Sequence, residues 1–155
     1  MNSLKILLVA PLFLLSVACG PSARVTAPDG FAELDEVDTY SYRATSAAGV
    51  VIGVRTEDNN PRGNLQFWTK ALDLKLKKSG YTALSDAPVK VSSKAGLEGR
   101  RLRYQTQKDG RNHEYWVTVF VTEANVIVVE AAGDEAYFDA ATKKQIEAAT
   151  QTVES

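Results

Sequence analysis

The sequence predicts an α+β protein in which one antiparallel sheet of about six strands is sandwiched between helices in a single domain. Three consecutive strands are expected at residues 97–107, 111–123 and 125–131. Asp109-Gly110 favours a tight hairpin between the first two, because glycine adopts positive φ at no steric cost. The strand around Trp116 is apolar on both faces, which is typical of a central strand in a sheet covered on both sides.

The first of these strands differs from the second. Leu102 and Tyr104 alternate along it with Arg101 and Arg103. Successive side chains of a strand point to opposite faces of the sheet. We therefore expect Leu102 and Tyr104 to be buried, and Arg101 and Arg103 to lie on a polar, solvated side.

Periodicity and capping predict the remaining elements. Leu65, Trp68 and Leu72 recur at helical spacing after Asn64, a good helix-capping residue, and Gly80 is expected to end this helix. A C-terminal helix is expected to open at Asp134-Glu135. Further strands are expected at residues 40–45, 49–57, 81–84 and 89–93.

Residues 1–18 have the pattern of an export signal. Lys5 supplies a positive start, and the apolar run at residues 6–17 is shorter than the roughly 20 residues that a membrane-spanning helix needs. The run ends in Leu15-Ser16-Val17-Ala18-Cys19, which resembles the lipobox of bacterial lipoproteins. In that family the cysteine is acylated at sulfur and the preceding peptide is removed. The resemblance implies that Cys19 is the lipid attachment site.

Cys19 is the only cysteine of the chain, so an intramolecular disulfide and a cysteine-based metal cluster are excluded. The alternative to acylation is an ordinary thiol. Residues 19–30 are small, polar and proline-containing, and are expected to form a lipidated tether before a domain at residues 31–155. The eleven residues after Cys19, 20–30, have an r.m.s. span of about 18 Å if they are flexible, which would hold the domain close to a membrane.

The expected strand region resembles the PsbP-like superfamily. The resemblance is carried by the segment from Gly96 to Tyr104, the Asp109-Gly110 turn, the strand at residues 115–120 and the valine-rich strand at 126–131, and it covers residues 40–153. This superfamily includes extrinsic proteins of photosystem II, a Ran-binding nuclear import factor and envelope lipoproteins of the LpqN type. It implies an antiparallel sheet between helices, in a domain that binds partners and has no shared catalytic residues.

The residues themselves offer little catalytic chemistry. His113 is the only histidine, and no Gly-x-Ser-x-Gly motif, His-x-x-x-His pair or phosphate-binding glycine loop accompanies it. We therefore expect a structural or exposed histidine, and no catalytic, cofactor-binding or metal site. The carboxylates are scattered along the chain, and a pair of the glycosidase type stays open as an alternative.

Charge is distributed unevenly along the chain. Residues 62–111 carry twelve Lys/Arg against four Asp/Glu, and both flanks are acidic. In one interpretation these segments interleave in the fold and neutralise one another as solvated surface. In the other, a basic partner-binding surface faces an anionic partner, and it consists of Lys75, Lys77, Lys78, Arg101 and Arg103.

Together these observations predict a non-enzymatic lipoprotein of the bacterial cell envelope. We expect it to be held to the membrane by N-terminal acyl chains, on the periplasmic face or at the outer membrane if the cell is Gram-negative. The expected partner is a protein or an anionic envelope component. Nucleic acid is not expected for an exported protein with a sequence pI of about 5.9. The alternative function is a small envelope hydrolase that acts on glycans.

Overall fold

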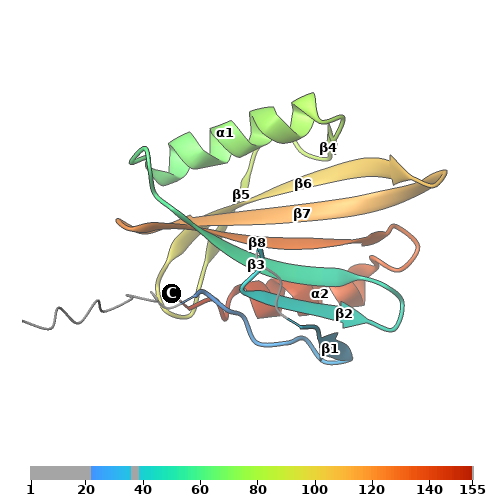
Figure 1. Ribbon diagram of the computed structural model, residues 1–155. Coiled ribbons are helices and arrows are strands. Elements are labelled where there is room, and N and C mark those ends of the chain that lie inside the picture. Colours follow the sequence, from blue (N-terminus) through green and yellow to red (C-terminus); the bar gives the residue numbers. More distant parts are fainter. Residues whose placement is uncertain (1–21, 36–38, 155) are drawn as a thin grey trace, which may run out of the picture.

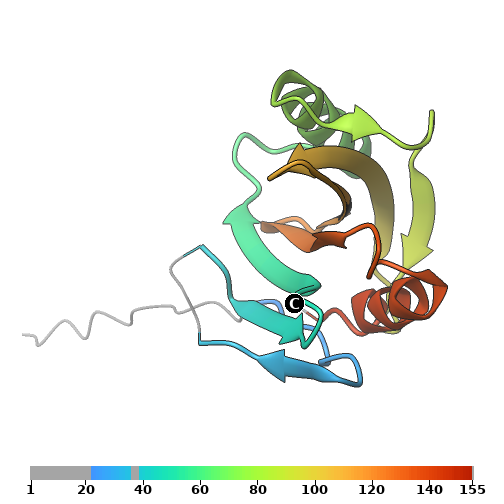
Figure 2. The same cartoon turned by 90° about the vertical axis from the view of Figure 1, so that its right-hand side faces the viewer.

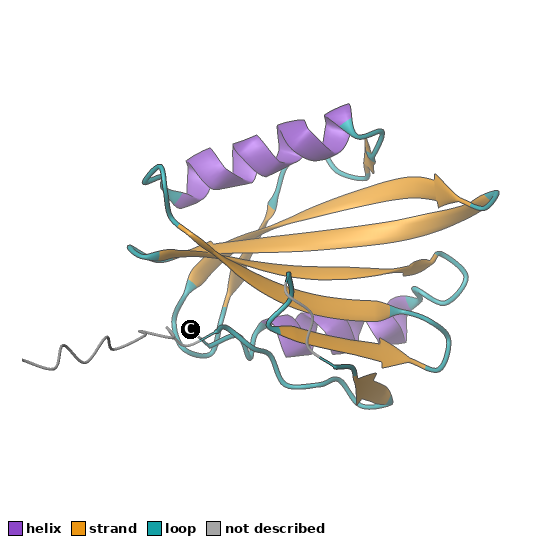
Figure 3. Ribbon diagram, viewed as in Figure 1, coloured by secondary structure: helices purple, strands orange, loops and turns teal. Residues whose placement is uncertain are grey.

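The computed structural model describes residues 22–35 and 39–154, so Cys19 and the expected export signal lie outside the described residues. The chain is α+β, as predicted, and two helices lie on opposite sides of one sheet (Figures 1 and 3). The elements are β1 (Phe31–Glu33), β2 (Tyr42–Ser46), β3 (Val51–Asp58), α1 (Leu65–Lys78), β4 (Thr82–Ala83), β5 (Val89–Ser92), β6 (Glu98–Lys108), β7 (Arg111–Val121), β8 (Asn125–Asp134) and α2 (Ala140–Thr150).

The sheet is antiparallel and has eight strands in the described part of the chain, rather than about six. Its order is β1-β2-β3-β8-β7-β6-β4, and β5 also pairs with β6. Figure 2 shows the strong twist of this sheet. Strand β1 was not expected, because residues 31–40 are acidic and lack an alternating apolar pattern.

The predicted central hairpin is confirmed. Asp109 and Gly110 link β6 to β7 with φ of 52° and 74°. Tyr104 pairs with Tyr115, and Leu102 pairs with Val117. Strand β7 lies between β6 and β8, as its two apolar faces require.

The two faces of β7 belong to two cores. Val117 and Val119 pack on the face covered by α1, together with Leu76 of that helix. Trp116 and Phe120 pack on the opposite face, where α2 and the segment after it contribute Ile146, Ala149 and Val153. Burial on both faces fixes the register of this strand, because a one-residue slip would exchange the two cores.

Gly99 of β6 is required by close packing against one of these cores. A Cβ at this position would lie 2.6 Å from Cε1 of Phe120, whose side chain is fully buried. Residue 99 also pairs with Phe120 across the strands. The glycine therefore makes room for the ring directly beside the backbone of its neighbour.

The two helices begin at carboxamide or carboxylate caps. Asn64 accepts a hydrogen bond from the backbone N–H of Phe67, and α1 starts where the sequence predicts. The C-terminal helix instead begins at Ala140, after the N-cap Asp139. The expectation that it opens at Asp134 was wrong, since β8 continues to this residue and pairs it with His113.

The expected tether at residues 19–30 is corrected by the structure over its described part, residues 22–30. Ala23 is fully buried and Val25 is nearly so, in the core on the α2 side of the sheet. Arg24 forms an isolated antiparallel bridge with Glu154, and Thr26 donates its backbone N–H to Thr152 at 2.7 Å. Small and polar residues predicted flexibility here, but apolar side chains at alternate positions place the segment on the domain. The folded unit therefore includes residues before 31.

Candidate functional site

An open groove lies between α1, the first half of β6 and the loop that joins β4 to β5. Its volume is about 610 Å³, which is within the range of small-molecule sites. Leu65 and Leu102 supply apolar surface, and Ala87 and Pro88 line it from the loop. We call this cavity the α1 groove. Its size and its mixed lining suit a ligand that has both apolar and polar parts.

Charged side chains of both signs line the α1 groove. Lys70, Lys77 and Arg100 contribute the cations. Lys70 forms no ion pair with any other residue that the structure describes. Its ammonium group is therefore available to an anionic or hydrogen-bonding part of a ligand. The acidic lining residues are Asp73, Asp86 and Glu98.

Asp73 is held in place within the groove. One carboxylate oxygen accepts a hydrogen bond from Tyr104 Oη at 2.6 Å, and the other accepts one from Lys77 Nζ at 2.9 Å. Burial alone would raise the pKa of this carboxyl, but the hydrogen bonds from Tyr104 and Lys77 outweigh it and lower the pKa. Asp73 is thus a fixed anion that orients Lys77.

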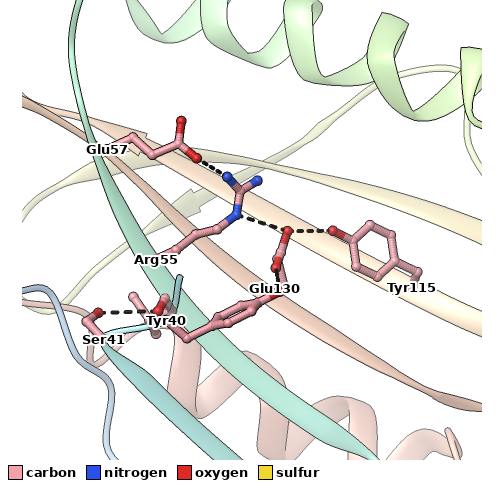
Figure 4. Close-up of polar contacts among 7 residues, drawn as sticks. Tyr40, Ser41, Arg55, Glu57, Tyr115 and Glu130 are labelled. Carbon is pink, nitrogen blue, oxygen red and sulfur yellow. Dashed lines mark hydrogen bonds and ion pairs between the residues drawn. The ribbon is translucent and has the colours of Figure 1, made fainter. Parts of the chain in front are cut away.

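A second polar cluster surrounds Glu130 of β8, on the face of the sheet that carries α1 (Figure 4). Its carboxylate accepts hydrogen bonds from Tyr40 Oη and Tyr115 Oη, both at 2.7 Å. Arg55 Nε approaches it at 3.3 Å, and the same guanidinium pairs with Glu57. The Glu130 side chain is only 13% exposed. This cluster fixes residues from three separate segments around one buried anion.

A small cavity of about 140 Å³ adjoins the Glu130 cluster. Tyr40, Arg43 and Tyr115 line it, and Gly53 forms part of its floor. A Cβ on Gly53 would lie 2.9 Å from the ring of Tyr40, so the glycine allows this ring to lie on β3. At this volume the cavity is far smaller than the α1 groove, which is the stronger candidate for a binding site.

Three tyrosines in these clusters have raised pKa values. Burial, reinforced by the hydrogen bond to Glu130, raises the pKa of Tyr40 to about 12. Burial and the charge of Glu130 raise the pKa of Tyr115, and burial with the hydrogen bond to Asp73 raises that of Tyr104. Each hydroxyl therefore stays protonated and continues to donate at alkaline pH.

These shifts predict a loss of stability at high pH. In the unfolded chain the tyrosines lose their protons near pH 10, while in the folded protein they keep them. Above about pH 10 the unfolded state therefore binds fewer protons than the folded state. The contribution of these tyrosines to the free energy of unfolding is complete below about pH 10, and it falls as the pH rises towards 12. Denaturant titrations at several pH values measure this fall. The Tyr115→Phe variant should show a shallower fall, and an equally steep one would contradict the assignment.

The expected basic surface does not form as one surface. Lys75, Lys77 and Lys78 lie in the last turn of α1, on one side of the sheet. Arg101 points to the opposite side, where its guanidinium lies 4.4 Å from the ring centroid of Trp116 and pairs with Glu147 of α2 at 2.6 Å. The sheet separates the two groups, so they cannot contact one flat partner together.

Arg101 was expected on a solvated face, and this expectation was wrong. Arg101 is only 9% exposed, because α2 covers it. Burial lowers the pKa of the Arg101 guanidinium, although the charge of Glu147 acts in the opposite direction. Arg103 is half-buried, and its Nε is buried without a hydrogen-bond partner within the part of the chain that the structure describes. Leu102 and Tyr104 are buried, as predicted.

The other sequence candidates lie apart from the groove. His113 is half-buried near the β6–β7 hairpin, and its Nδ1 lies 3.3 Å from the carbonyl oxygen of Arg111. Cys19 lies outside the described residues. Within residues 22–35 and 39–154, no group of three or more His, Cys, Asp or Glu side chains is placed to hold a metal ion.

Comparison with solved structures places this arrangement among known folds. LpqN of Mycobacterium tuberculosis, a protein involved in cell envelope biogenesis, matches with a TM-score of 0.63 at 17% identity, over 88% of this chain and 83% of LpqN. The cyanobacterial PsbP of Synechocystis sp. PCC 6803 matches with a TM-score of 0.53 at 10% identity, over 94% of this chain and 99% of that protein. The fold is PsbP-like.

A third structure with the PsbP-like arrangement is a protein of unknown function from Pseudomonas aeruginosa. It matches with a TM-score of 0.53 at 14% identity, over 94% of this chain and 93% of that protein. No protein-family model matches the sequence, and no curated protein matches it either. Among the described residues, no helix is long and apolar enough to cross a membrane.

Of the residues that line the α1 groove, the sequence predicted a binding role for only one. Lys77 was a candidate, whereas Lys70, Arg100 and Asp73 were not. Lys70 and Lys77 are two helical turns apart and Asp73 lies between them, so all three share one flank of α1. This spacing was a usable signal. The contribution of Arg100 and of the β4–β5 loop depends on tertiary packing that the sequence pattern does not reveal.

Proposed function

We propose that the chain is a lipid-anchored lipoprotein of the bacterial envelope whose PsbP-like domain binds a partner without catalysing a reaction. Cys19 is the attachment site, and the acyl chains hold the protein on the periplasmic face or at the outer membrane of a Gram-negative cell. The α1 groove is the observation that carries the binding role, because it is an open cavity of about 610 Å³ with apolar and charged walls. The likeness to LpqN supports a place in the envelope.

The bound partner is a protein segment or an envelope component with an anionic or hydrogen-bonding group. Lys70 supports this choice, because it lines the groove and forms no ion pair with another described residue. Leu65 and Leu102 offer apolar surface to the remainder of the ligand. Binding would then combine burial of apolar area with a few placed polar contacts, which is how most small-molecule sites work.

The electrostatics of Asp73 do not suit it to act as the acid of a glycan hydrolase. A glycosidase needs a carboxylic acid whose pKa is raised, so that it carries a proton at neutral pH. Asp73 has the opposite property, because its hydrogen bonds to Tyr104 and Lys77 lower its pKa. It is therefore an ionised positioning group rather than a proton donor. Hydrolysis of a glycan is the alternative function, and the crosslinking experiment described next would detect it as a cleaved product.

Photo-crosslinking tests the binding role of the groove. A photoreactive residue is placed at Gln66, which lines the groove, in the full chain expressed in a bacterium. The matched position is Gln107, an exposed residue beside the β6–β7 hairpin. We expect Gln66 to give a defined adduct with one envelope component and Gln107 to give none.

Filling the groove provides the second arm of this experiment. Ala87 is exposed and lines the cavity, so Ala87→Trp should occupy part of it without disturbing either core. We expect the adduct at Gln66 to be lost in this variant while the thermal unfolding midpoint is retained. An adduct that persists in the filled variant, or that forms equally at Gln107, would contradict the proposal. Recovery of a cleaved glycan would favour the hydrolase.

A further inference from the structure

The described chain begins almost at the expected acylation site. Only four residue steps separate Cys19 from Ala23, whose side chain is fully buried in the core on the α2 side of the sheet. Even a fully extended chain spans at most about 3.6 Å per residue, so Cys19 lies within roughly 14 Å of Ala23. An acylated Cys19 would therefore bring one end of the domain to the bilayer.

Hydrogen bonds define which part of the domain lies at that end. Arg24 and Glu154 exchange two backbone hydrogen bonds, at 3.3 and 3.2 Å. Lys94, in the loop between β5 and β6, donates its backbone N–H to the carbonyl oxygen of Gln151 at 2.7 Å. The start of the described chain, the β5–β6 loop and the C-terminal segment thus lie together. We call this end, formed by residues 22–26, 93–97 and 151–154, the proximal pole.

The strands run away from the proximal pole. Strand β6 starts at Glu98, directly after the β5–β6 loop, and continues to Lys108. At about 3.3 Å per residue this strand spans roughly 33 Å. The hairpin tip at Asp109 and Gly110 therefore lies at the opposite end of the molecule, as Figure 1 also shows.

Helix α1 runs in the same direction. Asn59, shortly before it, donates its side-chain N–H to the carbonyl oxygen of Thr122 at 3.0 Å, and this residue follows the end of β7 at Val121 that returns from the hairpin. The helix then extends about 20 Å from this end, at 1.5 Å per residue. Its last turn, with Lys75 and Lys78, is consequently remote from the proximal pole.

From these distances we infer that the proximal pole rests on the bilayer that holds the acylated Cys19, with the sheet strands directed away from the membrane. This inference rests on the proposed acylation. In this orientation the hairpin tip and the last turn of α1 lie at the end of the domain that is remote from the bilayer. The lysines in the last turn of α1 are therefore remote from the anchoring lipid headgroups.

Paramagnetic relaxation from the membrane surface tests this orientation. Cys19 is the only cysteine, so the chain from Cys19 to Ser155 can be coupled to a maleimide lipid in nanodiscs that also carry a gadolinium-chelating headgroup. We expect the amide signals of Lys94 and Ala95 to be lost and those of Asp109 and Gly110 to be retained. Uniform attenuation of all signals, or loss at the hairpin tip, would overturn the inference.

A longer connection provides the matched control. Insertion of a Gly-Ser linker of about 20 residues after Cys19 adds an r.m.s. reach of roughly 25 Å, so the contrast between Lys94 and Gly110 should largely disappear. A contrast that survives the linker would show that the surface of the proximal pole also holds it on the bilayer, which would support the orientation. Because the lipid is coupled chemically, this result does not depend on acylation in cells. Failure of acylation would refute the proposed function alone.

Discussion

Replacement of Arg101 by alanine is expected to lower the free energy of unfolding by about 2–3 kcal/mol. The change removes a nearly buried guanidinium that stacks on Trp116 and donates to Glu147. A desolvated cation–π contact contributes up to about 2 kcal/mol and a hydrogen bond to a charged group about 1.5–3 kcal/mol. We discount their sum because the Glu147 side chain is 44% exposed, and water can solvate the carboxylate that the variant leaves behind. Denaturant unfolding measures the loss.

Arg111→Ala is the matched control for this change. Arg111 also pairs with a carboxylate, that of Asp134, but its side chain is 63% exposed. Surface pairs contribute about 0–1 kcal/mol, so the control should stay within that range. If Arg101→Ala lowered the free energy of unfolding no more than Arg111→Ala, the contacts of Arg101 with Trp116 and Glu147 would not stabilise the fold. Arg101 would then again be a possible partner-binding residue.

Replacement of Glu130 by alanine should destabilise the protein by a similar amount, about 2–4 kcal/mol. The variant leaves the hydroxyls of Tyr40 and Tyr115 without their acceptor and Arg55 without its buried partner. An unsatisfied buried polar group costs about 1–3 kcal/mol. The three groups belong to one hydrogen-bonded network, so their individual costs do not simply add. Thermal or denaturant unfolding at neutral pH provides the measurement.

Glu130→Gln separates the charge of this residue from its shape. The amide retains one acceptor oxygen and nearly the same volume, so one tyrosine hydroxyl keeps a partner, while Arg55 loses one of its two counter-charges and keeps Glu57. The free energy of unfolding should therefore lie between those of the parent protein and Glu130→Ala. Equal stability of all three proteins would show that the cluster does not support the fold.

The pattern of apolar residues predicted the central part of the fold because burial on both faces leaves a strong signal. Val117 and Trp116 are adjacent in sequence and belong to different cores, and no arrangement other than a covered central strand satisfies both. Asn64 and Gly110 were equally informative, since a cap and a tight turn depend on local geometry. The fold class and the hairpin were therefore predicted correctly.

The prediction failed where tertiary contacts override local composition. Arg101 alternates with apolar residues and looks solvated, but a guanidinium can be buried when a facing carboxylate and an aromatic ring receive it. Ala23 and Val25 are too few to indicate an ordered segment by themselves, and the strands and C-terminal segment that cover them are distant in sequence. The α1 groove was missed for the same reason, because its walls come from three separate stretches of the chain.

The central claim is that this PsbP-like domain works from a lipid anchor at Cys19. The most direct test is the intact mass of the full chain after expression in a bacterium that processes lipoproteins and recovery from its membranes. The account predicts a chain that begins at Cys19 and carries the added mass of acyl groups on this residue, with Cys19→Ser unprocessed and unacylated. A protein that begins at another residue, or one that begins at Cys19 with no added mass, would contradict it.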